Sequence, residues 1–173
     1  PSAWQVADTL NLPVLLVVRP KGASLTLAAQ IKGLQSFRTP SHLVGILLND
    51  CKPGLYKMLA PMLEAETGLP VAGFLPPVPE AAIGSRHLGL YTAGEVADLQ
   101  QKIALLAQAA EENIRWEKLL SLCEQPAPAA AQIKQEHKKQ CVKIAVARDE
   151  AFCFAYAETL EALTAAGAEL VPF

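Results

Sequence analysis

Short, continuously apolar runs alternate with segments of helical periodicity along the first half of the chain. The apolar runs span residues 13–18, 44–48 and 71–74, and Gly, Pro or Asn residues follow them. A strand is apolar on both faces when helices cover both sides of a parallel sheet, so these runs predict buried parallel strands. The repeated alternation of strand and helix predicts right-handed crossovers, and the expected fold class is therefore α/β.

Several helix ends can also be read from the sequence. Ser2 and Gln5 form a capping-box pattern, because the serine hydroxyl can accept from the Gln5 N–H while the glutamine side chain reaches back. Ser24 is placed to cap a second helix, and Gly68 to end a third in the left-handed conformation. Residues 92–95 repeat the capping-box pattern and predict the start of a fourth helix.

The pattern changes after Leu90. Helical periodicity continues to Leu122, with an expected break near Asn113. Its apolar stripe consists of Val96, Leu99, Ile103 and Leu106. The next segment is rich in Pro and Ala, which is typical of a linker. These shifts divide the chain into a first α/β domain at 1–91, a helical connector at 92–125, a linker at 126–140 and a second α/β unit at 141–173.

The second unit has the pattern of a single strand–helix–strand motif. Residues 142–147 predict a strand, a helix carrying Phe154 and Leu160 ends at Gly167, and residues 170–173 predict another strand. One such motif cannot bury both faces of its sheet. It either joins the first sheet or opens a second domain whose remainder lies outside the chain, and the preceding linker favours the second arrangement. We therefore expect the chain to be truncated.

Composition narrows the function classes. The chain has 173 residues, of which 51% are hydrophobic, and a net charge of -2 with a pI near 5.9. This balance does not indicate binding to nucleic acid or to an anionic membrane. The sequence contains neither an apolar run approaching the roughly 20 residues of a membrane helix nor a signal-peptide pattern, and we expect a cytoplasmic protein.

Cysteine and histidine spacings do not indicate a reaction. The four cysteines follow no C-x-x-C or disulfide pattern and are expected to be reduced, with Cys153 in the core between two phenylalanines. The three histidines are not spaced as metal ligands, and no Ser/His/Asp or Cys/His arrangement stands out. The sequence therefore indicates no catalytic and no metal-binding residue.

The most suggestive polar residue is Asn49, which directly follows the second predicted strand. Ligands of open parallel sheets bind at the carboxyl ends of the strands. A carboxamide offers the donor and the acceptor needed to read the N6 and N7 edge of adenine. An Asn-Asp pair after a strand is also ordinary turn chemistry, and spacing alone favours that interpretation.

Two cationic segments could contact anions. Arg19 and Lys21 precede Gly22 and a helix amino end, which can hold an anion. The sequence contains no G-x-x-x-x-G-K-[ST] loop, however, and solvated loop cations are the simpler interpretation. Arg86 with the adjacent His87 could bind a carboxylate or a phosphate, although such a pair more often forms a surface turn. The residues alone identify no reaction.

Several segments together resemble the cobyrinic acid a,c-diamide synthase family. In chain order they are 12–18 (LPVLLVV), 45–49 (GILLN), 68–76 (GLPVAGFLP), 86–90 (RHLGL), 143–154 (KIAVARDEAFCF) and 167–171 (GAELV). The resemblance covers nearly the whole chain in the expected order, which makes it more specific than any single motif.

The resemblance implies a ligase of cobalamin biosynthesis. The family joins a P-loop synthetase domain, similar to dethiobiotin synthetase, to a class I glutamine amidotransferase domain. By resemblance, ATP and Mg²⁺ activate the a and c carboxylates of cobyrinate, and ammonia from glutamine then displaces phosphate. Residues 1–91 would be the C-terminal part of the synthetase domain, and residues 141–173 the beginning of the amidotransferase domain.

The resemblance also suggests a nucleotide site. By resemblance, Asn49 matches the position that reads adenine in related synthetases. The resemblance therefore favours a base contact for Asn49 over the interpretation as an ordinary turn residue. Leu75, Pro76 and Pro77 would form the adjoining wall of that base pocket.

Other positions match or depart from the family pattern. Arg86 and His87 fall on a family motif and are candidates for contacting substrate or phosphate. Arg19 stands where the family's strand usually ends in aspartate, and a Gly-Ser pair at 84–85 replaces Pro-Glu.

The resemblance places the phosphate-binding loop before Pro1 and the amidotransferase Cys and His after Phe173. We therefore expect the chain by itself to hydrolyse neither ATP nor glutamine, and to bind neither ATP nor Mg²⁺ tightly. Exposed sheet edges are expected to favour a homodimer. The alternative is a non-catalytic α/β module that binds a nucleotide or a regulatory partner.

Overall fold

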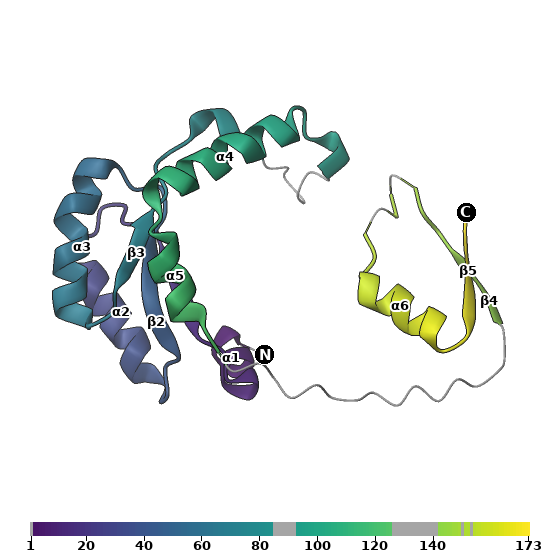
Figure 1. Cartoon of the computed structure of the whole chain (residues 1–173), viewed down its shortest axis with the longest axis horizontal. Helices are drawn as coiled ribbons and strands as arrows, with labels where there is room; N and C mark the ends of the chain where they lie inside the picture. Colours follow the sequence, from purple (N-terminus) through teal and green to yellow (C-terminus); the bar gives the residue numbers. More distant parts are fainter. Residues whose placement is uncertain (1, 85–92, 126–141, 150, 153) are drawn as a thin grey trace. The chain divides into compact units, whose positions relative to one another are not determined.

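The chain folds into two compact units, Pro1–Pro126 and Ala127–Phe173. The structure is a computed structural model that describes residues 2–84, 93–125, 142–149, 151–152 and 154–173 (Figure 1). Each unit contains a parallel sheet of its own, with three strands in the first and two in the second. The predicted α/β class with parallel sheets is therefore confirmed, and the second strand–helix–strand motif does not extend the first sheet.

The first sheet has the strand order β1-β2-β3. Its strands are β1 (Val14–Val18), β2 (Leu43–Leu48) and β3 (Val71–Phe74). At their carboxyl ends Val18 pairs with Leu48, and Leu48 pairs with Phe74. All four residues of β3 and the last four of β2 are buried, which explains the continuously apolar runs of the sequence.

Two helix ends agree with the sequence prediction, because neighbouring residues alone determine them. In α1 (Ala3–Leu10), the Gln5 N–H donates to Ser2 Oγ at 3.2 Å and the Ser2 N–H donates to Gln5 Oε1 at 2.7 Å, so the predicted capping box is confirmed. Gly68 ends α3 (Pro53–Thr67) in the left-handed conformation with φ 71°, also as predicted.

One predicted cap is wrong. The helix α2 (Leu25–Phe37) begins after Ser24, but the Ser24 side chain makes no capping hydrogen bond. Its backbone angles are φ -125° and ψ -104°, which differ from the extended conformation that directs a capping hydroxyl toward the N3 amide. The helix therefore starts where the residue type indicates, and the backbone at Ser24 prevents the expected contact.

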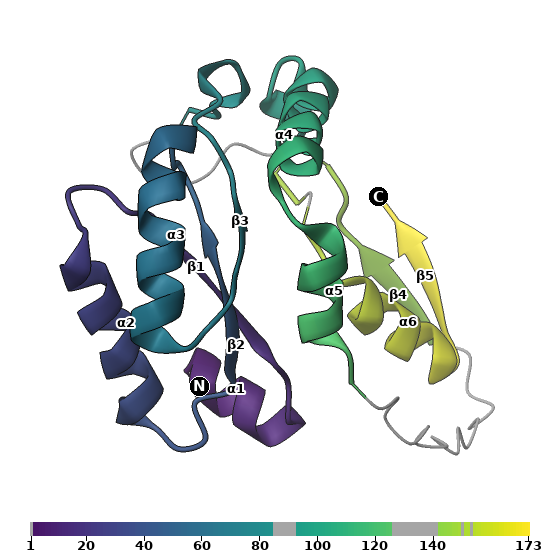
Figure 2. The ribbon, with the colours of Figure 1, turned by 60° about the vertical axis from the view of Figure 1, so that its left-hand side comes forward.

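The core of the first unit lies between the sheet and the helices α2 and α3, which cover one of its faces (Figure 2). Its fully buried large side chains come from these two helices and from β2 and β3, and they are Ile31, Ile46, Leu48, Leu59, Leu63 and Val71. Met58 of α3 does not belong to this core and is 61% exposed.

The helix α5 (Trp116–Cys123) contacts β2 and β3 from the opposite face of the sheet (Figure 2). Leu122 of α5 lies over Gly45, where an added Cβ would stand 2.8 Å from Leu122 Cδ1. This face is covered over β2 and β3 but less completely over β1, where Val17 remains 54% exposed.

The predicted helix start at residues 92–95 is wrong. A short 3₁₀ turn, η2 (Ala93–Glu95), comes first, and the α-helix α4 spans Leu99–Asn113 after Asp98 in the left-handed conformation with φ 55°. Thr92, the first residue of the expected capping box, lies outside the described residues. The break expected near Asn113 is confirmed, because α4 ends there and α5 begins at Trp116.

The segment between α4 and α5 runs along the free edge of β3. Ile114 forms an isolated antiparallel bridge with Gly73, and the Arg115 N–H donates to the Ala72 carbonyl at 2.8 Å. The Arg115 guanidinium also donates to the Val71 carbonyl. Strand edges need such partners because their N–H and C=O groups otherwise stay unpaired. Residues 99–123 therefore pack as part of the first unit.

Gly73 makes this approach sterically accessible. Its φ of +145° is a conformation that L side chains rarely adopt. A Cβ at this position would lie 2.5 Å from the Asn113 carbonyl oxygen and 2.8 Å from Ile114 Cα. Both neighbours are backbone atoms, so they cannot move aside as a flexible side chain could.

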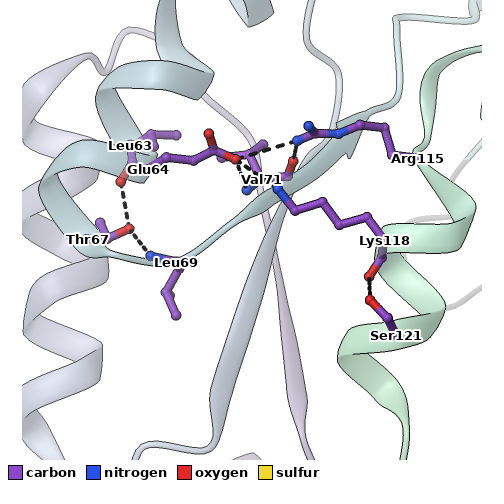
Figure 3. Close-up of polar contacts among 8 residues, drawn as sticks. All are labelled: Leu63, Glu64, Thr67, Leu69, Val71, Arg115, Lys118 and Ser121. Carbon is purple, nitrogen blue, oxygen red and sulfur yellow. Dashed lines mark hydrogen bonds and ion pairs between the residues drawn. The ribbon is translucent and has the colours of Figure 1, made fainter.

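A polar cluster beside the amino end of β3 adds side-chain contacts to the same junction (Figure 3). Glu64 Oε1 accepts from the Val71 N–H at 2.8 Å and lies 3.3 Å from Lys118 Nζ and 3.5 Å from the Arg115 guanidinium. Partial burial opposes ionisation of Glu64, but the Val71 N–H and the two cations outweigh it and hold the pKa of the carboxyl below its ordinary value of 4.5.

The second unit consists of β4 (Val142–Val146), α6 (Ala157–Ala165) and β5 (Ala168–Pro172), with β4 and β5 parallel. The predicted strand–helix–strand order is thus confirmed, although Phe154 precedes the helix and is 77% exposed. None of its described residues is buried. Cys153, expected in the core, lies outside the described residues, and its neighbour Phe152 is 62% exposed.

Within the described ranges, no helix combines the length and the apolar character that crossing a membrane requires.

Replacing Gly73 with Ala should lower the free energy of unfolding of the first unit by about 2–3 kcal/mol, since it combines backbone strain with overpacking. The matched control is Gly33→Ala in α2, where nothing lies within 4 Å of the added Cβ. That substitution should instead stabilise the unit by about 0.5 kcal/mol. Urea denaturation followed by circular dichroism measures both; equal effects of the two substitutions would contradict the role given to Gly73.

Glu64→Gln should lower the free energy of unfolding by about 1 kcal/mol at pH 7, an effect kept small because the side chain is 39% exposed. A carboxyl with a lowered pKa stabilises the folded state fully above its unfolded value and loses that contribution as the pH falls through the folded pKa. The difference between wild type and variant should therefore shrink below pH 4.5. A difference in urea midpoint that is the same at pH 7 and pH 3 would be inconsistent with an ionised Glu64.

Candidate functional site

The carboxyl ends of β1, β2 and β3 meet at one edge of the first sheet. Arg19, Asn49 and Leu75 directly follow these strands, and the strand register makes them neighbours. The Asn49 N–H donates to the Val18 carbonyl at 2.8 Å, and the Leu75 N–H donates to the Leu48 carbonyl at 2.7 Å. The sheet ladder thus continues into the first residue of each loop, which gives these residues fixed backbone positions.

Asn49 is exposed at this edge, and its carboxamide has no hydrogen-bond partner among the residues that the structure describes. The reversal of the chain occurs at Asp50, which has φ 52° in the left-handed region. Asparagine and aspartate tolerate this conformation better than other L residues. The two interpretations of the Asn-Asp pair therefore apply to different residues: Asp50 forms the turn, and the Asn49 side chain remains available for a ligand.

The three residues expected beside Asn49 continue from β3. Leu75 and Pro76 are half-buried and Pro77 is exposed, so they present apolar surface at the same end of the sheet as Asn49. The Leu75 carbonyl accepts from the Cys51 N–H at 2.9 Å, which ties the β3 loop to the β2 loop. Below them the rings of Tyr56 and Phe74 stack with centroids 4.5 Å apart.

The cations expected near this edge differ in their environment. The Arg19 guanidinium forms an ion pair with Asp50, so its charge is compensated. Lys21 is exposed, and its backbone N–H donates to the Arg19 carbonyl at 2.9 Å. The structure thus assigns Arg19 a protein partner. Arg86 and His87, the candidates for substrate or phosphate contact, lie outside the described residues.

The sequence alone did not reveal Asp50 as the partner of Arg19. The available signal was the placement of opposite charges directly after two successive strands, Arg19 one residue after β1 and Asp50 two residues after β2. That signal becomes useful only once β1 and β2 are known to be adjacent, because strand order decides which loop ends can touch.

Cys51 lies just below the same edge and is completely buried. Burial raises the pKa of its thiol above the ordinary value of 9.0, and the neighbouring negative charge of Asp50 raises it further. A thiolate is therefore disfavoured, and Cys51 is a protonated packing residue of the core.

Two cavities lie away from Asn49. One of about 400 Å³ is lined by residues 82–84, 95–98 and Lys102, whose ammonium donates to the Glu80 and Ala82 carbonyls at 3.1 Å and 3.0 Å. The other, of about 330 Å³, lies within the second unit between β4, β5 and the first turns of α6, next to Arg148. In the adjoining loop Asp149 Oδ1 accepts from the Ala151 and Phe152 N–H groups, each at 2.8 Å.

The described residues contain no group of three or more His, Cys, Asp or Glu side chains that could hold a metal ion. His42, the one histidine among them, directly precedes β2, and its Nε2 lies 2.9 Å from Oδ1 of Asp8 in α1. The remaining two histidines lie outside the described ranges.

Comparison with known proteins identifies relatives along nearly the whole chain. A cobyrinate a,c-diamide synthase from Clostridium tetani is 37% identical over 166 residues, which are 96% of this chain and 37% of that protein. A cobyrinate a,c-diamide synthase from Priestia megaterium is 37% identical over 174 residues, 99% of this chain and 38% of the relative. A hydrogenobyrinate a,c-diamide synthase from Mesorhizobium japonicum is 35% identical over 172 residues, 99% of this chain and 39% of the relative.

These relatives confirm the resemblance seen in the sequence. The chain spans somewhat more than a third of the length of the curated proteins it matches. No protein-family profile matches the chain. No solved structure matches it either.

The burial of Cys51 predicts slow thiol alkylation. In the native protein at pH 7.5, iodoacetamide should modify Cys51 roughly tenfold or more slowly than the exposed Cys123, because thiolate fraction and access both limit the rate. Peptide mapping by mass spectrometry separates the two sites. The control is the protein unfolded in about 6 M urea, where the two alkylation rates should become similar. Rapid native modification of Cys51 would contradict its placement.

Proposed function

Because the chain is related along nearly its whole length to cobyrinate and hydrogenobyrinate a,c-diamide synthases, we propose that it is part of a glutamine-dependent ligase that amidates the a and c carboxylates of a corrin-ring substrate. ATP would activate each carboxylate as an acyl phosphate, and ammonia released from glutamine would displace the phosphate. The proposed reaction belongs to cobalamin biosynthesis, and the proposed location of the enzyme is the cytoplasm.

The observation that carries the nucleotide part of this proposal is the environment of Asn49. A carboxamide reads adenine by donating to N7 or accepting from the N6 amine, and it must be free of protein partners to do so. Asn49 fulfils this condition among the described residues, at the edge of a parallel sheet where ligands bind. Leu75, Pro76 and Pro77 supply apolar surface at that edge, which suits one face of a planar base.

The described residues fit the base of ATP better than its metal. The Asn49 carboxamide and the Leu75–Pro76 surface suit adenine, whereas no described cluster of side chains suits Mg²⁺. We therefore assign base recognition to this chain and assign no Mg²⁺ ligand to it. Mg²⁺ bound with ATP would neutralise charge on the transferring phosphoryl group. By itself the chain should bind ATP weakly, because phosphate contacts supply much of the affinity for a nucleotide.

The two units correspond to two proposed catalytic parts. Residues 1–91 would be the C-terminal part of a P-loop synthetase domain, and residues 141–173 the beginning of a class I glutamine amidotransferase domain. The division between the compact units falls after Pro126, at the start of the proposed linker 126–140. Residues 92–125, the proposed connector, supply α4 and α5, which pack on the synthetase-side sheet.

The lack of any buried residue in the described part of the second unit supports its being the start of a larger domain. In the complete protein, additional strands and helices would cover its exposed aromatic side chains, among them Phe152, Phe154 and Phe173. Where such surfaces stay uncovered, they and the open strand edges would favour the homodimer expected from the sequence.

The test is diamidation by the full-length protein that contains this chain, supplied with MgATP, glutamine and either cobyrinate or hydrogenobyrinate. Asn49→Leu should raise the KM for ATP about tenfold with little change in kcat, because a base contact is made equally in the ground and transition states. Gln30→Leu, which removes an exposed carboxamide on α2, is the matched control and should leave both constants unchanged.

Mass spectrometry of the corrinoid product and release of phosphate give two independent readouts. Nucleotide binding without ligase activity would favour the alternative of a non-catalytic nucleotide-binding module. Full activity with an unaltered KM for ATP in Asn49→Leu would contradict base recognition by Asn49 while leaving the ligase assignment intact.

A further inference from the structure

The second unit contains a cavity of about 330 Å³ at the carboxyl ends of its two parallel strands. Ligands of parallel sheets bind at this end of the strands, and ligand pockets begin at a volume of about 300 Å³. Of the described residues that line the cavity, Arg148 is the one with a polar side chain. The others are apolar, among them Phe152 from the loop, Leu160 from α6 and Leu170 from β5. The cavity therefore has apolar walls and one cationic group.

The loop that lines the cavity is held by hydrogen bonds within the second unit. The Arg148 N–H donates to the Phe173 carbonyl at 3.0 Å, which continues the pairing of β4 with β5 into the loop. Asp149 Oδ1 then accepts from the Ala151 and Phe152 N–H groups, each at 2.8 Å. These contacts fix the backbone on which Arg148 and Phe152 lie. A preformed cavity binds a ligand at a lower cost in conformational entropy than a loop that must first be ordered.

The charge at the cavity favours a ligand with a single negative charge. The Arg148 guanidinium has no ion-pair or hydrogen-bond partner among the residues that the structure describes. Asp149 follows it in the sequence, and Glu158 lies in the first turn of α6, so two carboxylates stand close to the one cation along the chain. A phosphate dianion would be repelled by these carboxylates. A carboxylate carries one charge, and its planar shape matches the two parallel N–H donors of a guanidinium.

We propose that this cavity binds a small organic carboxylate, with its apolar body against Phe152, Leu160 and Leu170 and its carboxylate on Arg148. Small-molecule sites commonly combine an apolar lining with a few polar groups, because burial of the apolar body supplies affinity and the polar group fixes the orientation. The site lies within the second unit, so the inference is independent of the proposed recognition of adenine by Asn49.

The experiment follows the methyl NMR signals of Leu160 and Leu170 in the full-length protein, with 3-phenylpropionate as the probe. The probe should shift both signals with a Kd of roughly 1 mM, a weak affinity because a small cavity buries little surface. The neutral amide 3-phenylpropionamide has nearly the same shape and should bind about fivefold more weakly, the upper end for an exposed ion pair. Arg148→Gln should remove this difference, since the acid and the amide then meet the same uncharged side chain.

The control is Lys143→Gln, which removes another exposed cation of β4, 3.5 Å from Glu169, that does not line the cavity. It should leave both affinities unchanged. Ala155→Trp should abolish the shifts from both probes, because the exposed Ala155 lines the cavity and a larger side chain would fill it. Unchanged methyl signals of the first unit verify that each variant is folded.

Three results would overturn the proposal. The first is the absence of any shift at about 10 mM probe, a concentration that reveals millimolar binding. The second is an equal affinity for acid and amide in the wild type, or a preference for the acid that survives Arg148→Gln. The third is binding that persists in Ala155→Trp, because the probe would then lie outside the cavity.

Discussion

The backbone of Ile114 and Arg115 hydrogen-bonds along the free edge of β3, and much of the first unit depends on that contact. Gly73 permits it, because any side chain there would collide with backbone atoms of the crossing segment. The contact ends α4, starts α5 and brings α5 onto the face of the sheet opposite α2 and α3. A helical segment that reads as a connector in the sequence thereby becomes part of the sheet's packing.

The Glu64 cluster stabilises the same junction from the side. Its carboxylate accepts from the first N–H of β3 and pairs with both Arg115 and Lys118, so helix α3, strand β3 and the start of helix α5 share one charged centre (Figure 3). This cluster lies at the amino end of β3, and the candidate nucleotide residues lie at the carboxyl end. At that carboxyl end, Leu75 is held beside the β2 loop by backbone hydrogen bonds with Leu48 and Cys51.

The sequence predicts those features that local chemistry decides. Continuous apolar runs become strands, Ser2 and Gln5 form their capping box, and Gly68 ends α3, because each depends on neighbouring residues alone. Ser24 makes no capping hydrogen bond because its backbone is not in the extended conformation of a capping residue. The expected apolar stripe of α4 is not its packed side: Lys102 donates to the Glu80 and Ala82 carbonyls, whereas Ile103 is 48% exposed.

The candidate site also combines features that the sequence predicts with features that only the structure shows. Asn49 was found because a polar residue directly after an apolar strand is visible in the sequence. Only the structure shows that its carboxamide has no hydrogen-bond partner within the described ranges. The Arg19–Asp50 pair depends on strand order, which no local pattern contains. The proposed reaction rests on the ordered similarity to a,c-diamide synthases, because the described residues include a candidate base contact and no group of side chains suited to a metal ion.

Photoaffinity labelling of the full-length protein with 8-azido-ATP tests most directly whether nucleotide binds at the carboxyl edge of the β1–β3 sheet. After irradiation and digestion, the label should be found on the peptides that contain Asn49 or Leu75, Pro76 and Pro77, and excess ATP should prevent it. Label that excess ATP displaces from other peptides, with none on these two, would show that the adenine binds elsewhere and would contradict the assignment of Asn49.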